Sequence, residues 1–140
     1  MRKTLIALWG PANCGKSATI KRVYELFRSK YRNTEIFHDD FGRRDFVVIL
    51  IIHGKKVGIG SQGDPNSKLP ANLKLFLKEK CNVIICATRT RGQTVDAVDA
   101  LKKQYQIVWF EQERSARAKH QASNNAMARK IFRTAEAAIR

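Results

Sequence analysis

The residues best suited to chemistry lie together near the start of the chain, in the run Gly10-Pro11-Ala12-Asn13-Cys14-Gly15-Lys16-Ser17. This run matches the pattern G-x-x-x-x-G-K-[ST] at every specified position. Glycines let backbone N–H groups converge on an anion, a lysine carries a positive charge to phosphate oxygens, and a serine hydroxyl is an oxygen ligand for Mg²⁺. We therefore expect a cradle for a nucleoside triphosphate, with Lys16 at the β- and γ-phosphates and Ser17 on the metal. The expected nucleotide-binding residues are Gly10, Pro11, Ala12, Asn13, Cys14, Gly15, Lys16, Ser17 and Ala18.

The segments on either side of this run have the patterns that such a cradle needs. Thr4–Trp9 is a short apolar run that ends at Gly10-Pro11, which is typical of a buried strand. Ser17–Arg32 has apolar residues on one helical face and basic residues on the other, which predicts an amphipathic helix. The start of that helix would direct the positive end of its dipole towards the bound phosphates.

With this motif and these flanks, residues 1–110 resemble the P-loop NTPase superfamily, in which the matching pattern is called Walker A. The resemblance implies a mostly parallel sheet with the nucleotide at the carboxyl ends of the strands, near the switch point. It also implies a nucleoside triphosphate and Mg²⁺ as ligands. It leaves open whether the chain is a kinase, a GTPase or an ATP-driven machine.

A second set of oxygen ligands is expected in the run Val57–Asp64. In this superfamily an acid after a buried strand completes the magnesium site, and here Asp64 arrives late, after Ser61-Gln62-Gly63. Asp64 is therefore predicted as a catalytic and metal-site residue, with Gln62 able to orient an attacking water. The alternative is a turn that Asp64-Pro65 begins. The next candidate acids are Asp39 and Asp40.

Two arginines follow another buried strand, in Thr88-Arg89-Thr90-Arg91. An arginine at a strand end near the phosphates stabilises the charge on a transferring phosphoryl group. Arg89 and Arg91 are therefore predicted as catalytic residues. The alternative is a strand-to-helix loop in which Thr94 caps the next helix and both arginines are solvated. Arg43-Arg44 is the weaker candidate pair.

The order of helix, loop, hairpin and glycine-bearing tip also resembles the switch region of small GTPases. Thr34 would then lie in the first switch and Gly63 at the γ-phosphate. Gly60 stands where that family has an acid, however, and no Asn-Lys-x-Asp follows any later strand. An atypical small GTPase therefore stays the minor alternative, and the missing guanine motif favours adenine.

The remaining patterns predict an α/β fold, with a mostly parallel five-stranded sheet, a β-hairpin and helices on both faces. Thr34–Arg44 is polar and is expected to be a loop. A nucleotide-binding domain is expected over residues 1–113, followed by a basic amphipathic helical extension over 114–140. The predicted strands are Thr4–Trp9, Phe46–Ile52, Val57–Gly60, Asn82–Ala87 and Gln106–Phe110. The later predicted helices are Ala71–Lys80, Gln93–Tyr105 and Ser115–Arg140, the last being one helix or a pair broken near Ser123-Asn124-Asn125.

The charge of the chain is strongly positive, at +15 with a pI near 10.3. Such a charge points to polyanionic partners, or to no more than a solvated basic surface. Residues 114–140 hold seven basic residues against one acid, with Met127, Ile131, Ala135 and Ile139 at helical spacing. That apolar stripe either packs on the sheet or docks a partner, such as nucleic acid or an acidic protein.

Composition narrows the setting of the protein. Three cysteines are too few, and odd in number, for a disulfide framework, which indicates a reducing compartment. The apolar run after Met1-Arg2-Lys3 is too short for a secretory signal, and no run is long enough to span a membrane. The expectation is a cytoplasmic protein that uses Mg-ATP as a small phosphotransferase or ATPase, the alternative being a nucleotide-dependent binding module for nucleic acid or an acidic partner.

Overall fold

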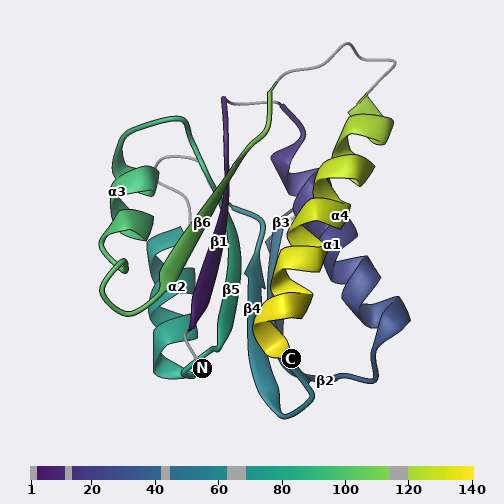
Figure 1. The fold of residues 1–140 in the computed structure, drawn as a ribbon. Helices are drawn as coiled ribbons and strands as arrows, with labels where there is room; N and C mark the ends of the chain where they lie inside the picture. The colour runs from purple at the N-terminus through teal and green to yellow at the C-terminus, as the bar shows by residue number, and fades with distance from the viewer. Residues whose placement is uncertain (1–2, 12–13, 42–44, 63–68, 114–119) are drawn as a thin grey trace.

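The computed structural model describes residues 3–11, 14–41, 45–62, 69–113 and 120–140. These residues form one β-sheet with helices on both of its faces (Figure 1). The elements in chain order are β1 (Thr4–Trp9), α1 (Lys16–Lys30), β2 (Thr34–Phe41), β3 (Asp45–Ile52), β4 (Lys55–Gly60), α2 (Leu69–Lys78), β5 (Val83–Thr88), α3 (Gln93–Asp99), β6 (Gln106–Glu111) and α4 (His120–Ile139).

The sheet has six strands in the order β2-β3-β4-β5-β1-β6. Strands β4, β5, β1 and β6 pair in parallel, whereas β3 runs antiparallel to both β2 and β4. The predicted α/β class and the β3–β4 hairpin are therefore confirmed. The prediction of a five-stranded, mostly parallel sheet is wrong, because β2 adds a strand and the β2–β3–β4 part of the sheet is antiparallel.

Strand β2 replaces the loop expected over Thr34–Arg44. Every residue from Thr34 to Asp40 is exposed, and the pairing with β3 shifts at a bulge between Glu35 and Phe37. An edge strand without a buried face needs no alternation of apolar and polar residues, so its sequence resembles that of a loop.

Two hydrophobic clusters cover the two faces of the sheet. On one face α1 and α4 pack side by side (Figure 1), with Phe27, Ile131 and Phe132 in the shared core. On the other face α2 and α3 lie over Leu5, Ala7 and the alternate residues of the neighbouring strands. The apolar stripe of α4 is thus buried within the fold, and α4 continues without a break through Ser123-Asn124-Asn125.

Helix α3 is shorter than expected and ends at Asp99 instead of Tyr105. Beyond it the backbone makes bonds three residues apart, such as Leu101 N–H to Val98 O at 3.0 Å, which are turns. The hydroxyl of the buried Tyr105 donates to the carbonyl of Cys81 at 2.7 Å and fixes the start of β6.

No helix of these described segments combines the length and apolar composition that crossing a membrane requires.

Candidate functional site at the carboxyl edge of the sheet

The predicted phosphate-binding residues Gly10–Ser17, called here the phosphate segment, join the central strand β1 to the first turn of α1. Gly15 precedes the helix with φ at +95°, a left-handed conformation that glycine adopts without strain. The strands β1, β4, β5 and β6 all end at this edge of the sheet, at the top of Figure 1. The carboxyl edge is therefore where loops from several strands meet.

Lys16 is folded back onto the beginning of the same segment. Its side chain is buried, and Nζ donates to the carbonyl of Gly10 at 2.5 Å and to that of Pro11 at 3.1 Å. A buried ammonium group requires polar partners, because desolvation of the charge is otherwise costly. The positive charge of Lys16 is therefore buried beside the first two residues of the segment, Gly10 and Pro11.

Ser17 has an acidic neighbour that the sequence analysis missed. Its hydroxyl donates to Oδ1 of Asp45 at 3.2 Å, and Asp45 is the first residue of β3. The same carboxylate lies 3.2 Å from Ser61 Oγ and accepts from Gln62 Nε2 at 3.5 Å. The only sequence signal for Asp45 is that it directly precedes the apolar run of β3.

A hydrogen-bond network supports the segment from behind. Nε2 of Gln112, the residue after β6, donates to the carbonyl of Cys14 at 2.7 Å and to Oδ1 of Asn124 at 2.7 Å. Oε1 of Gln112 accepts from the hydroxyl of Thr19 at 2.8 Å. One buried amide therefore ties the segment to both α1 and α4, and sequence patterns gave no sign of it.

The two glycines of the segment fit closely against this network. A Cβ added at Gly10 would lie 2.3 Å from the backbone oxygen of Gln112, and one at Gly15 would lie 2.7 Å from Oδ1 of Asn124. Real side chains do not approach this closely. Packing against backbone therefore requires glycine at Gly10, whereas at Gly15 the neighbouring side-chain ends can shift and the left-handed φ is the stronger reason for glycine.

The ends of β1 and β5 form the switch point of the sheet. Helix α1 leaves β1 over one face, and α3 leaves the adjacent β5 over the other (Figure 1). Ligands of open α/β sheets bind in the crevice outside such a pair of strand ends. The buried Thr88 ends β5, and Arg89 follows, half-buried, with its N–H held by the Thr94 hydroxyl at 3.0 Å. Arg89 therefore lies at the switch point beside the phosphate segment.

Other predicted site residues are less well placed or lie outside the described residues. Arg91 is exposed, as is Ala18 on α1. Asp40 bonds to His38 at 3.0 Å, and the pKa of His38 is raised because bonds to Asp40 and Glu35 outweigh the opposite effect of burial. The residues outside the described ranges are Ala12, Asn13, Arg43, Arg44, Gly63 and Asp64.

The buried Cys86 next to the site is not suited to reaction. Burial raises the pKa of the Cys86 thiol on β5 to about 12, so this thiol stays protonated and unreactive. Within the described ranges, no three His, Cys, Asp or Glu side chains group as metal ligands.

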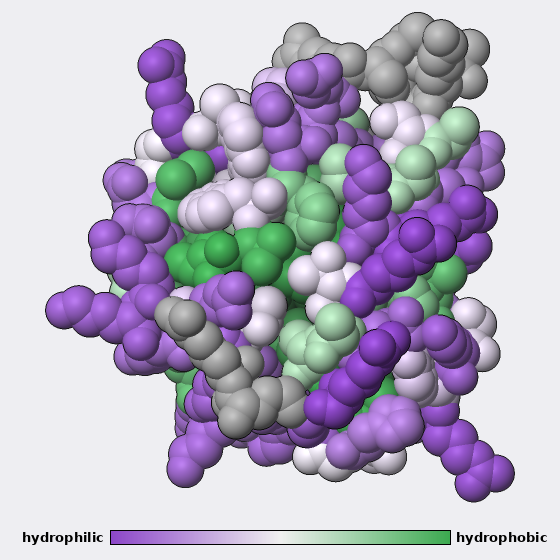
Figure 2. All heavy atoms as spheres, in the orientation of Figure 1, coloured by the Kyte–Doolittle hydropathy of each residue, from purple (hydrophilic) through white to green (hydrophobic). Residues whose placement is uncertain are grey.

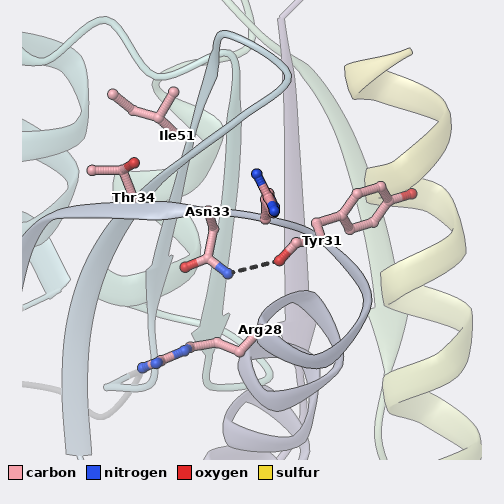
Figure 3. Close-up of a pocket in the computed structure, with 6 residues that line it drawn as sticks. Arg28, Tyr31, Asn33, Thr34 and Ile51 are labelled. Carbon is pink, nitrogen blue, oxygen red and sulfur yellow. Dashed lines mark hydrogen bonds between the residues drawn. The ribbon is translucent and has the colours of Figure 1, made fainter.

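A polar hollow of about 430 Å³ lies at the opposite edge of the sheet (Figure 3). Thr34 begins β2 there and pairs with Ile51 near the end of β3, whereas Asp45 begins β3 beside Ser17. The assignment of Thr34 to a GTPase-like first switch therefore loses its geometric basis. The residues lining this hollow are Arg28, Tyr31, Arg32, Asn33, Thr34 and Ile51.

Comparisons with family models, with curated proteins and with solved structures find no match to this chain.

Proposed function

We propose that the chain binds a nucleoside triphosphate at Gly10–Ser17 as its Mg²⁺ complex, and that it is an ATP-dependent phosphotransferase or ATPase. One observation carries the proposal: Lys16 is buried against the carbonyls of Gly10 and Pro11, in a segment that leads from a central strand into a helix start. This arrangement supplies a fixed positive charge and a helix N-terminus at the same point, which suits phosphate.

The residues beside the helix start fit Mg²⁺. Two oxygens bound next to each other on an octahedral Mg²⁺, each at ~2.1 Å, lie about 3 Å apart. The oxygens of Ser17 and Asp45 are 3.2 Å apart, so this pair suits neighbouring positions on one ion. When bound with the nucleotide, Mg²⁺ would neutralise charge on the phosphates. Asp45 is therefore proposed as an Mg²⁺ ligand beside Ser17, and Asp64, the acid predicted from the sequence, lies outside the described residues.

Phosphoryl transfer asks little covalent chemistry of a protein, since positioning and charge stabilisation supply most of the catalysis. Lys16 would hold the β- and γ-phosphates, and Arg89 would stabilise charge from the neighbouring strand end. Arg91 is exposed and is expected to contribute less. The sequence has no Asn-Lys-x-Asp motif for guanine, which favours ATP over GTP.

A turnover assay tests this proposal. ADP formation from Mg-ATP is measured with water, nucleosides and nucleotides as acceptors, for the wild-type chain, Arg89→Ala and Arg91→Ala. Loss of the stabilising charge is expected to lower kcat about 10²-fold in Arg89→Ala, with a far smaller change in Arg91→Ala. If no acceptor supports ADP formation by the wild-type chain, the enzymatic part of the proposal is wrong.

A second candidate function rests on the surface of α4. Its apolar stripe is buried, and Arg129, Lys130 and Arg133 remain exposed on a chain of net charge +15. Such a surface suits a polyanion, with nucleotide setting the affinity. A nucleotide-dependent binding module would bind DNA or RNA with an affinity that falls as salt is added and that changes when ATP is present. Substitution of these three residues by Gln would lower that affinity. If the substituted chain binds DNA and RNA as tightly as the wild type does, this surface is not the binding site.

A further inference from the structure

The two tryptophans of the chain line the same hollow, next to the phosphate segment. Trp9 ends β1, directly before Gly10, and Trp109 lies on the neighbouring β6. Ala7 pairs with Trp109, and strand residues alternate between faces, so Trp9 and Trp109 share the face that α3 covers. With Thr90 and Val95 they line a hollow of about 290 Å³, called here the tryptophan hollow.

The tryptophan hollow is open and mainly apolar. Trp109 is a large aromatic side chain and is 37% exposed. Figure 2 shows hydrophobic side chains reaching the surface over β6 and α3, with hydrophilic side chains around them. The core of the fold therefore leaves one aromatic face uncovered close to the switch point.

The position of the tryptophan hollow defines what it can accept. Its walls come from β1 and β6, from the β5–α3 connection and from α3, so it lies beside the switch point. Small-molecule sites begin at ~300 Å³, so a hollow of 290 Å³ suits one ring system rather than a whole nucleotide. Aromatic side chains hold flat heterocycles by stacking, whatever the base.

We propose that the tryptophan hollow binds the ring of a nucleobase. The inference rests on the proposed function, because the Gly10–Ser17 segment next to Trp9 would hold the phosphates that accompany such a ring. Two sources carry the same chemistry: the base of the bound triphosphate, and the base of a nucleoside or nucleotide that accepts the phosphoryl group. Trp109 would be the stacking residue, with Thr90 supplying a hydroxyl at the rim.

The experiment uses the intrinsic fluorescence of the chain, since both tryptophans lie in this hollow. Trp9→Phe removes the ring adjoining the phosphate segment and leaves Trp109 as the reporter. Adenosine, guanosine, cytidine, thymidine and ATP are titrated against it, with inorganic tripolyphosphate as the ligand that has no ring. Base-bearing ligands are expected to quench Trp109, and tripolyphosphate is not.

Affinity is then compared among Trp109→Ala, Trp109→Phe and Phe37→Ala by calorimetry. Phe37 on β2 is the matched control, because it is an aromatic residue of nearly the same exposure, 38%, outside the hollow. Loss of one stacking contact is expected to weaken base-bearing ligands about tenfold in Trp109→Ala. Trp109→Phe should retain most of the affinity and Phe37→Ala all of it.

Competition distinguishes the two sources of the ring. If ATP displaces adenosine, the hollow holds the base of the bound triphosphate. If adenosine and ATP bind at the same time, the hollow holds the base of an acceptor. If tripolyphosphate binds but no base-bearing ligand quenches Trp109 and Trp109→Ala binds ATP like the wild type, the tryptophan hollow is not a base site. If nucleosides and ATP quench Trp109 with equal affinity while tripolyphosphate does not bind, the ring site stands and the proposed phosphate site fails.

Discussion

Asp45 completes the oxygen pair at the phosphate segment, although it is 28 residues from Ser17 in sequence. Local patterns single out Lys16 and Ser17, because the spacing of a phosphate-binding motif is set by residues that are neighbours in sequence. No such spacing relates Ser17 to Asp45: their contact depends on β3 running antiparallel, which brings its first residue to the carboxyl edge. Local patterns therefore favoured Asp64, which follows β4, and did not single out Asp45, the first residue of β3.

The Asp45 assignment predicts a specific loss of Mg²⁺ dependence. Asp45→Asn keeps the size of the side chain and one oxygen for the hydroxyls of Ser17 and Ser61, but it loses the acceptor for Gln62 Nε2 and the charge that favours Mg²⁺. The variant is expected to bind ATP without Mg²⁺ about as well as the wild type does, and to lose most of the gain in affinity on adding Mg²⁺. Calorimetry with and without Mg²⁺ measures that gain, with the exposed Asp99→Asn as the control. If adding Mg²⁺ raises ATP affinity as much in Asp45→Asn as in the wild type, Asp45 is not an Mg²⁺ ligand.

Gly10 is predicted to be the most sensitive glycine of the segment. Gly10→Ala would bring Cβ within 2.3 Å of the Gln112 carbonyl, and the backbone must shift. Overpacking of this kind costs roughly 1–3 kcal/mol of unfolding free energy, measured by urea denaturation. The control is Gly54→Ala, at φ +76° with open space around its Cβ, where backbone strain is the main cost. A Gly10→Ala chain as stable as the wild type would contradict the packing described here.

At the scale of the elements, α4 is both a packing helix and a support for the phosphate segment. Its apolar stripe enters the core beside α1, and Asn124 in its second turn reaches Gln112. Helical spacing predicted the stripe and left open what would cover it. Only the tertiary structure shows that the stripe packs within the fold, because α1 and the strands that cover it lie far from α4 in sequence.

Loss of the Asn124 side chain is expected to loosen the phosphate segment without unfolding the chain. In Asn124→Ala, Gln112 keeps its bonds to Cys14 and Thr19 but loses one restraint. We expect ATP affinity to fall several-fold, the effect of about 1 kcal/mol for one hydrogen bond. Asn125→Ala, one residue further around the helix, is the matched control. Equal affinities in the two variants would show that α4 does not support the site.

The α1–α4 contact also carries a pH-dependent part of the stability. Glu136 on α4 is buried and accepts from Lys30 at 2.6 Å and from the hydroxyl of Tyr31. Burial by itself raises the pKa of Glu136, but these two bonds outweigh it and hold the pKa below its ordinary value of 4.5. Because the folded pKa is lowered, this stabilisation is present above pH 4.5 and is lost as pH falls through the folded pKa.

Urea denaturation across acidic pH tests this contact. The unfolding free energy of the wild-type chain is expected to fall more steeply below pH 4.5 than that of Glu136→Gln, whose side chain does not titrate. Glu25→Gln removes an exposed carboxylate of α1 and serves as the control. Parallel curves for the wild type and Glu136→Gln would mean that the contact does not contribute.

At the scale of the whole molecule, the sequence predicted the alternation of strands and helices but not the order of the strands. Periodicity is a local signal, whereas the insertion of β5 between β4 and β1 is a property of the assembled sheet. Strand β2 was missed because it lies at an edge and buries no face. The sheet order matters for function, since it places Arg89 and the tryptophan hollow at the same switch point as the phosphate segment.

The central claim is that Gly10–Ser17 holds the phosphates of ATP through the buried Lys16. Calorimetric titration with Mg-ATP of the wild-type chain, Lys16→Ala and Lys21→Ala tests it most directly, because Lys21 is an exposed lysine on the same helix. Binding is predicted for the wild type and Lys21→Ala, with affinity reduced at least a hundredfold in a folded Lys16→Ala chain. Unchanged affinity in Lys16→Ala, or no binding by the wild type, would contradict the claim.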